Sequence, residues 1–139
     1  EIADLGFEDA LVDFIHYPAK AARPYVVAAN PELVNRIAGD DMMRGCTIAA
    51  NGFYGPQGRV LRCDLAVKEI NDLITDFRYE GQRITNYEME GSAIAGLSLL
   101  MGHKAMTVCC VIAQRKVEAA NTDYKPRIKQ LVQTVLERI

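Results

Sequence analysis

The chain of 139 residues has no tryptophan, only two histidines, and a net charge close to zero. Its 16 lysines and arginines nearly balance 18 aspartates and glutamates, which leaves a net charge of −2. A nucleic-acid-binding protein normally carries a basic excess, so we expect no nucleic-acid partner. The two histidines, His16 and His103, are far apart in the sequence, which argues against a histidine-rich metal site. We therefore expect no metal.

The sequence also lacks a long apolar run and a cysteine motif. No stretch reaches the length of a membrane span, and the first residues do not have the basic and then apolar regions of a signal peptide. The four cysteines, at positions 46, 63, 109 and 110, have no C-x-x-C spacing. We expect them to be small buried residues, in neither disulfides nor metal sites. These features predict a soluble, cytoplasmic protein without a membrane partner.

Length and periodicity predict one α/β domain over residues 1–139. The patterns indicate four strands, over residues 11–17, 46–50, 84–89 and 105–113. They indicate four helices, over residues 31–38, 65–77, 91–101 and from about residue 122 to the end. Because strands alternate with helices, we expect helices layered around a sheet.

Several of these elements have clear end signals or a clear expected burial. Asn30 followed by Pro31 is a strong helix start, and Asp64 is the expected cap of the next helix. Gly102 is the expected end of the third helix, which reads as buried. The run at 105–113 is almost continuously apolar, which predicts a strand that is covered on both faces.

Residues 86–90, Asn-Tyr-Glu-Met-Glu, place two carboxylates where a strand passes into a helix. Alternate strand residues point to opposite faces, so only one of Glu88 and Glu90 is expected to face a given pocket. Glu90 can be a simple first-turn acid, which the helix N-terminus stabilises. It can instead accept hydrogen bonds from two neighbouring hydroxyls of a sugar. The small residues of the following helix favour the second interpretation, because they let the helix pack closely.

Residues 52–59, Gly-Phe-Tyr-Gly-Pro-Gln-Gly-Arg, form a loop whose path three glycines and a proline restrict. The amide of Gln57 can form hydrogen bonds with both a carbonyl and an N–H of a planar base, and the Arg59 guanidinium can donate to a carbonyl. Phe53 or Tyr54 could stack on the same ring. The alternative is a turn whose aromatic residues only anchor it to the core.

Three segments together resemble consecutive signatures of the nucleoside phosphorylase family, and uridine phosphorylases in particular. They are residues 52–59, residues 86–93 and residues 111–115, Val-Ile-Ala-Gln-Arg. Their order and spacing match as well, and the resemblance extends from Asp9 to the C-terminal helix. It implies a three-layer α/β/α fold with a mixed central sheet.

The resemblance implies reversible phosphorolysis of uridine, in which inorganic phosphate is the co-substrate and no other cofactor takes part. The products are uracil and ribose 1-phosphate. It implies a homo-oligomer, and a set of eight substrate-binding residues: Phe53, Gln57, Arg59, Glu88, Met89, Glu90, Ile112 and Arg115. The reaction needs no protein nucleophile, so catalysis would consist of holding the sugar and stabilising charge on the leaving base.

Within that set, the resemblance gives each group a task. Gln57 and Arg59 would bind the uracil ring, Phe53 would line the base pocket, and Arg115 would lie near the base O4. Glu90 would hold the ribose hydroxyls. The three residues implied in catalysis are Glu90, Arg59 and Gln57.

The other two residues of the acidic segment have supporting tasks: Met89 would pack on the sugar, and Glu88 would support the site. Purine-specific members of the family usually carry an aspartate just after the strand that corresponds to residues 108–113. This chain has Ala113-Gln114-Arg115 there, which favours a pyrimidine.

The family's phosphate-binding loop, of Gly-Asp-x-x-Arg type, has no counterpart in the sequence. We therefore expect the chain to be the C-terminal part of a phosphorylase domain, incomplete at its N-terminal side and inactive alone. The alternatives are a purine nucleoside phosphorylase, a nucleosidase that uses water, a non-catalytic nucleoside-binding protein, and a structural α/β domain.

Overall fold

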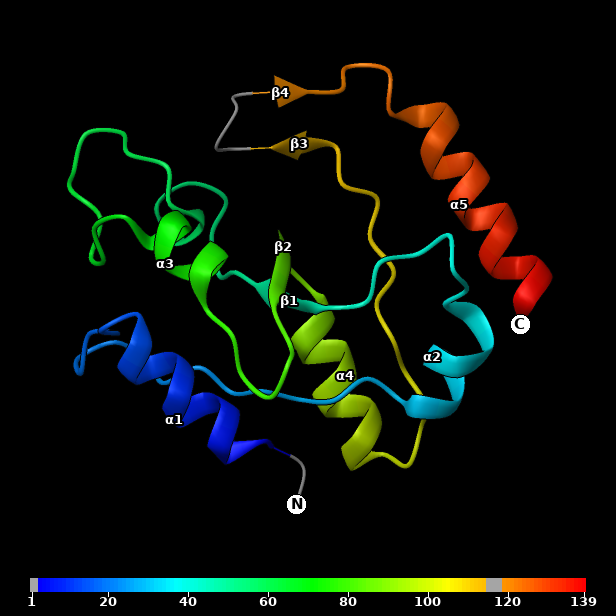
Figure 1. Ribbon diagram of the computed structural model, residues 1–139, viewed down its shortest axis with the longest axis horizontal. Coiled ribbons are helices and arrows are strands. Elements are labelled where there is room, and N and C mark those ends of the chain that lie inside the picture. Colours follow the sequence, from blue (N-terminus) through cyan, green and yellow to red (C-terminus); the bar gives the residue numbers. More distant parts are fainter. Residues whose placement is uncertain (1–2, 115–118) are drawn as a thin grey trace.

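A computed structural model describes residues 3–114 and 119–139 of the chain (Figure 1). In chain order its elements are α1 (Leu5–Phe14), α2 (Pro31–Ile37), β1 (Cys46–Ala49), the 3-10 turn η1 (Gly55–Gln57), α3 (Ile70–Asp76), β2 (Ile84–Glu88), α4 (Gly91–Leu100), β3 (Ala113–Gln114), β4 (Ala119–Ala120) and α5 (Lys125–Arg138). The α/β class predicted from the sequence is confirmed.

Two short sheets contain the strands. β1 and β2 are parallel, with α3 in the connection between them, and Ala49 lies opposite Glu88 at the end of the pair. β3 and β4 form a separate antiparallel pair. Within the described residues the two pairs are not joined, so the mixed central sheet and the three layers stay predictions.

The core lies between α1, α3 and the β1–β2 pair. Phe7, Leu11 and Ile15 recur every four residues along one side of α1 and its end, and they pack against Ile74 and Phe77. The rings of Phe7 and Phe77 lie 5.3 Å apart in a tilted arrangement. This core fixes α3 against the sheet, and with it the loop that precedes α3.

The predicted strand at residues 11–17 is wrong, because most of this segment belongs to α1. Asp4 caps the helix, since its Oδ1 accepts a hydrogen bond of 3.0 Å from the backbone N–H of Phe7. The four-residue spacing of the buried side chains begins at Phe7, ahead of the segment that reads as a strand. His16, with φ of 52°, ends the helical path before Pro18.

The helix after Asn30 is confirmed, and the next helix is shorter than predicted. The Asn30 side chain accepts a 3.1 Å hydrogen bond from Leu33 N, and Pro31 occupies the first turn. Asp64 does not cap a helix. α3 begins only at Ile70, because Glu69 has the left-handed φ of 57° and interrupts a helix that would start earlier.

The strand predicted at residues 105–113 is also wrong, since only Ala113 and Gln114 pair with another strand. The helix at 91–101 is confirmed, but it is not buried: Ile94 and Leu97 of α4 are 58% and 59% exposed. The last helix is confirmed as α5, with exposed Val132 and Leu136. A two-stranded sheet covers too little area to bury these apolar segments.

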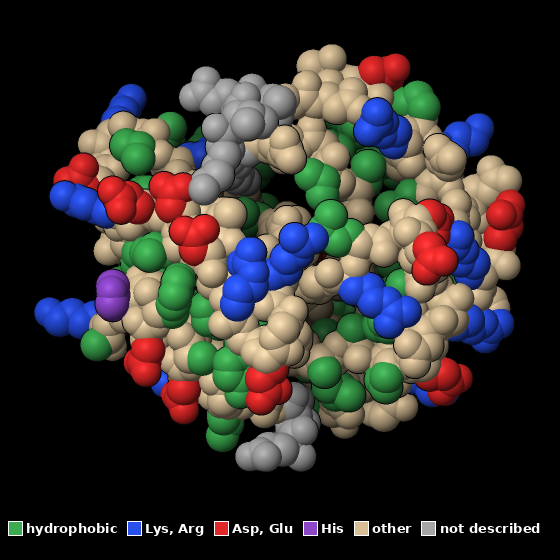
Figure 2. Space-filling model, in the orientation of Figure 1, with side chains coloured by type: hydrophobic (Ala, Val, Ile, Leu, Met, Phe, Trp, Pro, Cys, Tyr) green, Lys and Arg blue, Asp and Glu red, His purple; other side chains and the backbone are tan. Residues whose placement is uncertain are grey.

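The surface carries both signs of charge. Figure 2 shows acidic and basic side chains scattered over one face, in keeping with the net charge of −2. None of the helices in residues 3–114 and 119–139 has the length and apolar content needed to cross a membrane. In the same residues no three histidine, cysteine or acidic side chains converge as metal ligands do.

All four cysteines are free thiols. Cys46 and Cys110 are half-buried, whereas Cys63 and Cys109 are exposed. The expectation of buried packing residues is therefore wrong for the exposed pair. Burial raises the pKa of the Cys46 thiol above its ordinary value, so this group is protonated at neutral pH.

Candidate functional site

A cavity runs along the parallel β1–β2 pair and reaches the carboxyl ends of both strands. β1 ends at Ala49 and leads into the 52–59 loop, while β2 ends at Glu88 and leads into α4. Because parallel strands end at the same edge, the two predicted segments meet there. The coil that follows α2, part of α3, the coil before β3 and one side of α5 also line it.

Seven of the eight residues proposed from the sequence line this one cavity: Phe53, Gln57, Arg59, Glu88, Met89, Glu90 and Ile112. The eighth, Arg115, lies outside the described residues. Sequence separation within the set reaches from position 53 to position 112, so the fold, not local sequence, brings these groups together.

The 52–59 loop holds its polar side chains in a compact arrangement. Backbone N–H groups of Gln57 and Arg59 each donate to Tyr54 O at 3.0 Å, which closes the η1 turn. Gly58 follows with φ of 73°, a conformation that glycine adopts at low cost. The turn therefore brings the side chains on either side of Gly58 toward each other.

Arg59 is held by three contacts with two residues of the loop. Its Nη1 donates to Gln57 Oε1 at 3.3 Å and to the backbone oxygen of Phe53. Its Cζ lies 3.9 Å from the centre of the Phe53 ring, in a cation–π contact. Gln57 itself is only 3% exposed. The loop thus places an almost fully buried amide, an ordered guanidinium and an exposed aromatic ring in the lining of the cavity.

The aromatic pair does not anchor the loop to the core. Phe53 and Tyr54 are 52% and 54% exposed, and their rings form an edge-to-face pair 5.3 Å apart. The alternative of a turn that is pinned by buried aromatics therefore does not describe this loop.

The two glutamates at the end of β2 have different environments. Glu88 Oε2 accepts hydrogen bonds from the backbone N–H groups of Glu90, at 2.9 Å, and Gly91, at 2.5 Å. Glu90 occupies the N-cap position of α4, but its side chain makes no capping hydrogen bond and is exposed. The carboxylate that caps the helix is therefore that of Glu88.

Gly91 makes room for this arrangement. A Cβ atom at this position would lie 2.6 Å from Thr107 Oγ1 and 3.0 Å from Glu88 Oε2, both too close for a larger residue. The other Glu88 oxygen, Oε1, is buried and has no hydrogen-bond partner within the described residues. Close packing of the β2 end against α4 thus depends on the small residue that begins the helix.

The sequence did not point to two further contributors to the cavity. Asn71 of α3 lines it and accepts a 3.0 Å hydrogen bond from the Tyr87 hydroxyl. Arg127 of α5 also lines it. Both stand in ordinary helical patterns, and no motif marks them; only the packing of the helices places them at the site.

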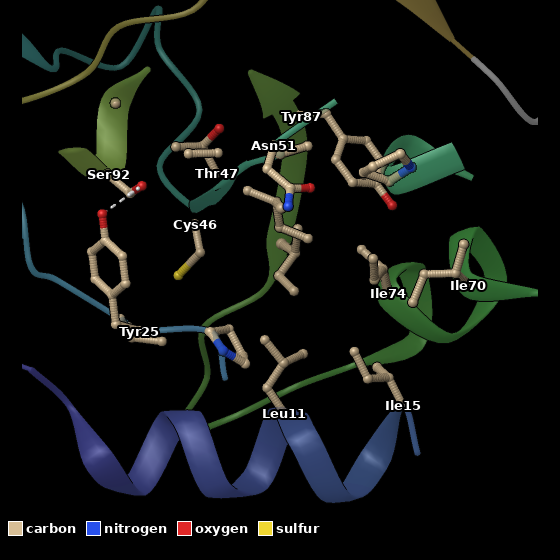
Figure 3. A pocket seen from close by; sticks show the side chains of 18 of the residues that line it. Leu11, Ile15, Tyr25, Cys46, Thr47, Asn51, Ile70, Ile74, Tyr87 and Ser92 are labelled. Atoms are coloured by element: carbon tan, nitrogen blue, oxygen red, sulfur yellow. Dashed lines mark hydrogen bonds between the residues drawn. The ribbon is translucent and has the colours of Figure 1, made fainter. Parts of the chain in front are cut away.

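A second cavity lies between α1, the β1–β2 pair and α3 (Figure 3). Apolar side chains such as Leu11, Ile15 and Ile74 point into it from α1 and α3. At its rim the Tyr25 hydroxyl donates to Ser92 Oγ at 3.2 Å. Of the seven described residues of the predicted site, only Arg59 also borders this space, and the other six line the first cavity alone.

Comparison with known proteins identifies the family of the chain. The family model described as "Phosphorylase superfamily" matches residues 3–138. Uridine phosphorylase A of Schistosoma mansoni is 40% identical over 73 residues, which are 51% of this chain and 24% of that relative. The chain thus aligns with about a quarter of that protein's length. No solved structure matches the chain. Because the family match covers almost the whole chain, the protein belongs to the phosphorylase superfamily.

Proposed function

We propose that the whole protein catalyses the reversible phosphorolysis of a pyrimidine nucleoside, with uridine as substrate and inorganic phosphate as co-substrate. The observation that carries this proposal is the meeting of the Gln57–Arg59 pair and the Glu88–Glu90 edge in one cavity. Superfamily membership and the similarity to a uridine phosphorylase support it.

The base would lie against the 52–59 loop. The amide of Gln57, whose Oε1 also accepts from Arg59, has both a donor and an acceptor group, and Arg59 carries further N–H donors toward a carbonyl of uracil. The exposed ring of Phe53 and the 41% exposed Ile112 are apolar surfaces for the faces of the base. We assign Arg115 a place near O4, by resemblance alone.

The ribose would lie against the end of β2. The exposed carboxylate of Glu90 can accept hydrogen bonds from two neighbouring hydroxyls, and Met89, 42% exposed, offers an apolar surface to the sugar ring. Glu88 supports this edge through its hydrogen bonds to the first N–H groups of α4. In this arrangement Glu90 binds the ribose, and Glu88 fixes the start of α4 beside it.

This arrangement suits a reaction without a protein nucleophile. Phosphate attacks the anomeric carbon, the bond to the base breaks, and the electron pair leaves with the base. Glu90 would hold the sugar as its ring becomes cationic, and Gln57 and Arg59 would stabilise negative charge on the departing uracil. We assign no described residue to the phosphate.

A pyrimidine is preferred to a purine in this proposal because β3 carries Ala113 and Gln114 and no aspartate. For the whole protein we further propose a three-layer α/β/α domain with a mixed sheet, of which residues 1–139 form the C-terminal part. We also propose a homo-oligomer. The four free thiols support a reducing, cytoplasmic setting.

The proposal is tested by incubating the chain with uridine, with and without phosphate, and measuring both uridine binding and uracil release. We expect binding without release, because base- and ribose-holding groups are present and no phosphate-holding group is assigned. Uracil release that needs phosphate would show that the chain holds a phosphate site after all. Release without phosphate would favour a nucleosidase, and absence of uridine binding would overturn the proposal.

A further inference from the structure

Asn71 connects the two halves of the cavity. From its place in the first turn of α3 its Oδ1 accepts a 3.0 Å hydrogen bond from the Tyr87 hydroxyl, and its Nδ2 donates to Gly58 O at 3.4 Å. Tyr87 immediately precedes Glu88 at the sugar side, and Gly58 stands between the two polar residues of the base side. One amide side chain therefore reaches both segments.

The contact between Asn71 and Gly58 leaves no room for a side chain at position 58. A Cβ atom on Gly58 would lie 2.4 Å from Asn71 Nδ2, so any larger residue would displace the amide. Gly58 also has φ of 73°, which only glycine adopts readily. The loop is thus shaped at this residue both by its own backbone conformation and by the side chain that packs on it.

Gly58 in turn sets the relation between its neighbours. Gln57 is buried just before it, and Arg59 follows it and donates to Gln57 Oε1 at 3.3 Å. A rotation of the Gly58 peptide would move these two side chains relative to each other. The hydrogen bond from Asn71 to the Gly58 carbonyl opposes that rotation.

We propose that Asn71 is a positioning residue that sets the base selectivity of the site by fixing the orientation of Gln57 and Arg59. The inference rests on the proposed function of the cavity. Uracil presents a carbonyl, an N–H and a second carbonyl, whereas cytosine presents an acceptor nitrogen and an amino group in place of the last two. An amide distinguishes these edges only if it is held in one orientation.

Two variants separate the two hydrogen bonds of Asn71, to Gly58 and to Tyr87. In Asn71→Asp the carboxylate still accepts from the Tyr87 hydroxyl but can no longer donate to Gly58 O. In Tyr87→Phe the ring keeps its place against the core, and only the hydroxyl is lost. Asn35→Asp is the matched control, because Asn35 is an exposed helical asparagine on α2 that accepts from Arg44, as an aspartate can.

The experiment measures the dissociation constants of the chain for uracil and for cytosine by NMR titration, with circular dichroism to verify folding. We expect the chain to prefer uracil and Asn35→Asp to keep that preference. Asn71→Asp should lower the ratio of the cytosine constant to the uracil constant by about ten-fold, the equivalent of one hydrogen bond of ordinary strength. Tyr87→Phe should lower the same ratio by about three-fold.

A structural role alone would weaken both bases equally, so a folded Asn71→Asp chain with an unchanged ratio overturns the inference. If Asn71→Asp does not fold, an unchanged ratio in Tyr87→Phe overturns it in the same way. A chain that binds uracil normally but shows no effect in either variant leaves the proposed function intact and removes only the role of Asn71. A chain that binds neither base overturns both.

Discussion

At the scale of single residues, the two glutamates of the 86–90 segment have separate tasks. One carboxylate oxygen of Glu88 accepts hydrogen bonds from two backbone N–H groups at the start of α4. The side chain of Glu90 remains exposed at the cavity. A charged acceptor at a helix N-terminus stabilises the helix through hydrogen bonds and through its dipole. Stability should therefore depend on Glu88, and binding on Glu90.

We expect Glu88→Ala to lower the free energy of unfolding by about 1 kcal/mol, as the loss of a helix cap does. We expect Glu90→Gln to leave that free energy unchanged and to weaken uridine binding by about ten-fold, through loss of charged hydrogen bonds to the ribose. Urea unfolding and uridine titration of both variants measure the two effects. Equal destabilisation by both substitutions would contradict the division of tasks.

The positions of these residues could be predicted from the sequence, but their division of tasks could not. Motifs at 52–59 and 86–90 predicted which residues lie at the cavity. The prediction that only one of Glu88 and Glu90 faces a given pocket is wrong, because both line the same cavity, and residues two apart on a strand share a face. Which carboxylate caps α4 is decided by the backbone geometry at the end of β2, where the N–H groups of Glu90 and Gly91 both point to Glu88 Oε2. Asn71 was missed because its partners come from separate segments of the chain.

At the scale of elements, hydrogen bonds from two arginines join the C-terminal ends of α2 and α5. Arg138 donates to both carboxylate oxygens of Asp41, at 2.9 Å each, and to Ile37 O at 2.8 Å. Arg36 of α2 donates to Arg138 O at 3.0 Å. Because α5 also lines the cavity, these contacts help to place its lining residues.

The pairing of Arg138 with Asp41 predicts how the stability of α5 depends on pH. The hydrogen bond from Arg138 holds the pKa of Asp41 below its ordinary value of 3.8. A carboxyl group with a lowered folded pKa stabilises the folded state above its unfolded pKa, and that contribution is lost as the pH falls through the folded pKa. The amides of α5 should thus lose protection from hydrogen exchange as the pH falls below about 4.

Asp41→Asn should remove the same contribution at neutral pH and raise exchange in α5 roughly two-fold, a small effect because the pair is solvent-exposed. Glu32→Gln is the control, because Glu32 of α2 pairs with Lys104 and not with α5. Hydrogen-exchange mass spectrometry measures both. Equal effects of the two substitutions on α5 would rule out a specific role for the Asp41 pair.

Two local end signals held and one failed, since Asp64 does not cap α3, and the prediction that depended on burial also failed. Asn30 and Pro31 start α2 as predicted, and Gly102, with φ of 74°, follows the end of α4. The apolar run at 105–113 predicted a covered strand, yet almost all of it is coil in the described structure. An apolar run shows that a segment prefers to be covered, but not which element covers it.

At the scale of the whole molecule, the chain exposes more surface than a compact monomer. Its accessible area is 10,053 Å². A compact protein of its mass of 15.4 kDa is expected to expose about 7,200 Å². Part of the excess is apolar and lies on α4 and α5, where Leu97, Leu100 and Leu136 are each more than half exposed. These faces are the ones that the proposed assembly would cover.

We expect the monomeric chain to unfold in urea with a slope of free energy against denaturant about one fifth smaller than that of a compact domain of equal length. The slope follows the area exposed on unfolding, and this chain buries less. Light scattering at the working concentration verifies that the chain is monomeric. A slope equal to that of a compact domain would mean that the monomer buries its apolar faces in another arrangement.

We propose that the cavity at the end of β1 and β2 holds a pyrimidine base on one side and a ribose on the other. Titration of the isotope-labelled chain with uridine and with inosine, followed by the backbone amide resonances of Gln57, Gly58, Glu90 and Gly91, tests it most directly. We expect uridine to shift the resonances of both segments together, with a single dissociation constant that is lower than the constant for inosine. Tighter binding of inosine, or uridine-dependent shifts confined to other parts of the chain, would contradict it.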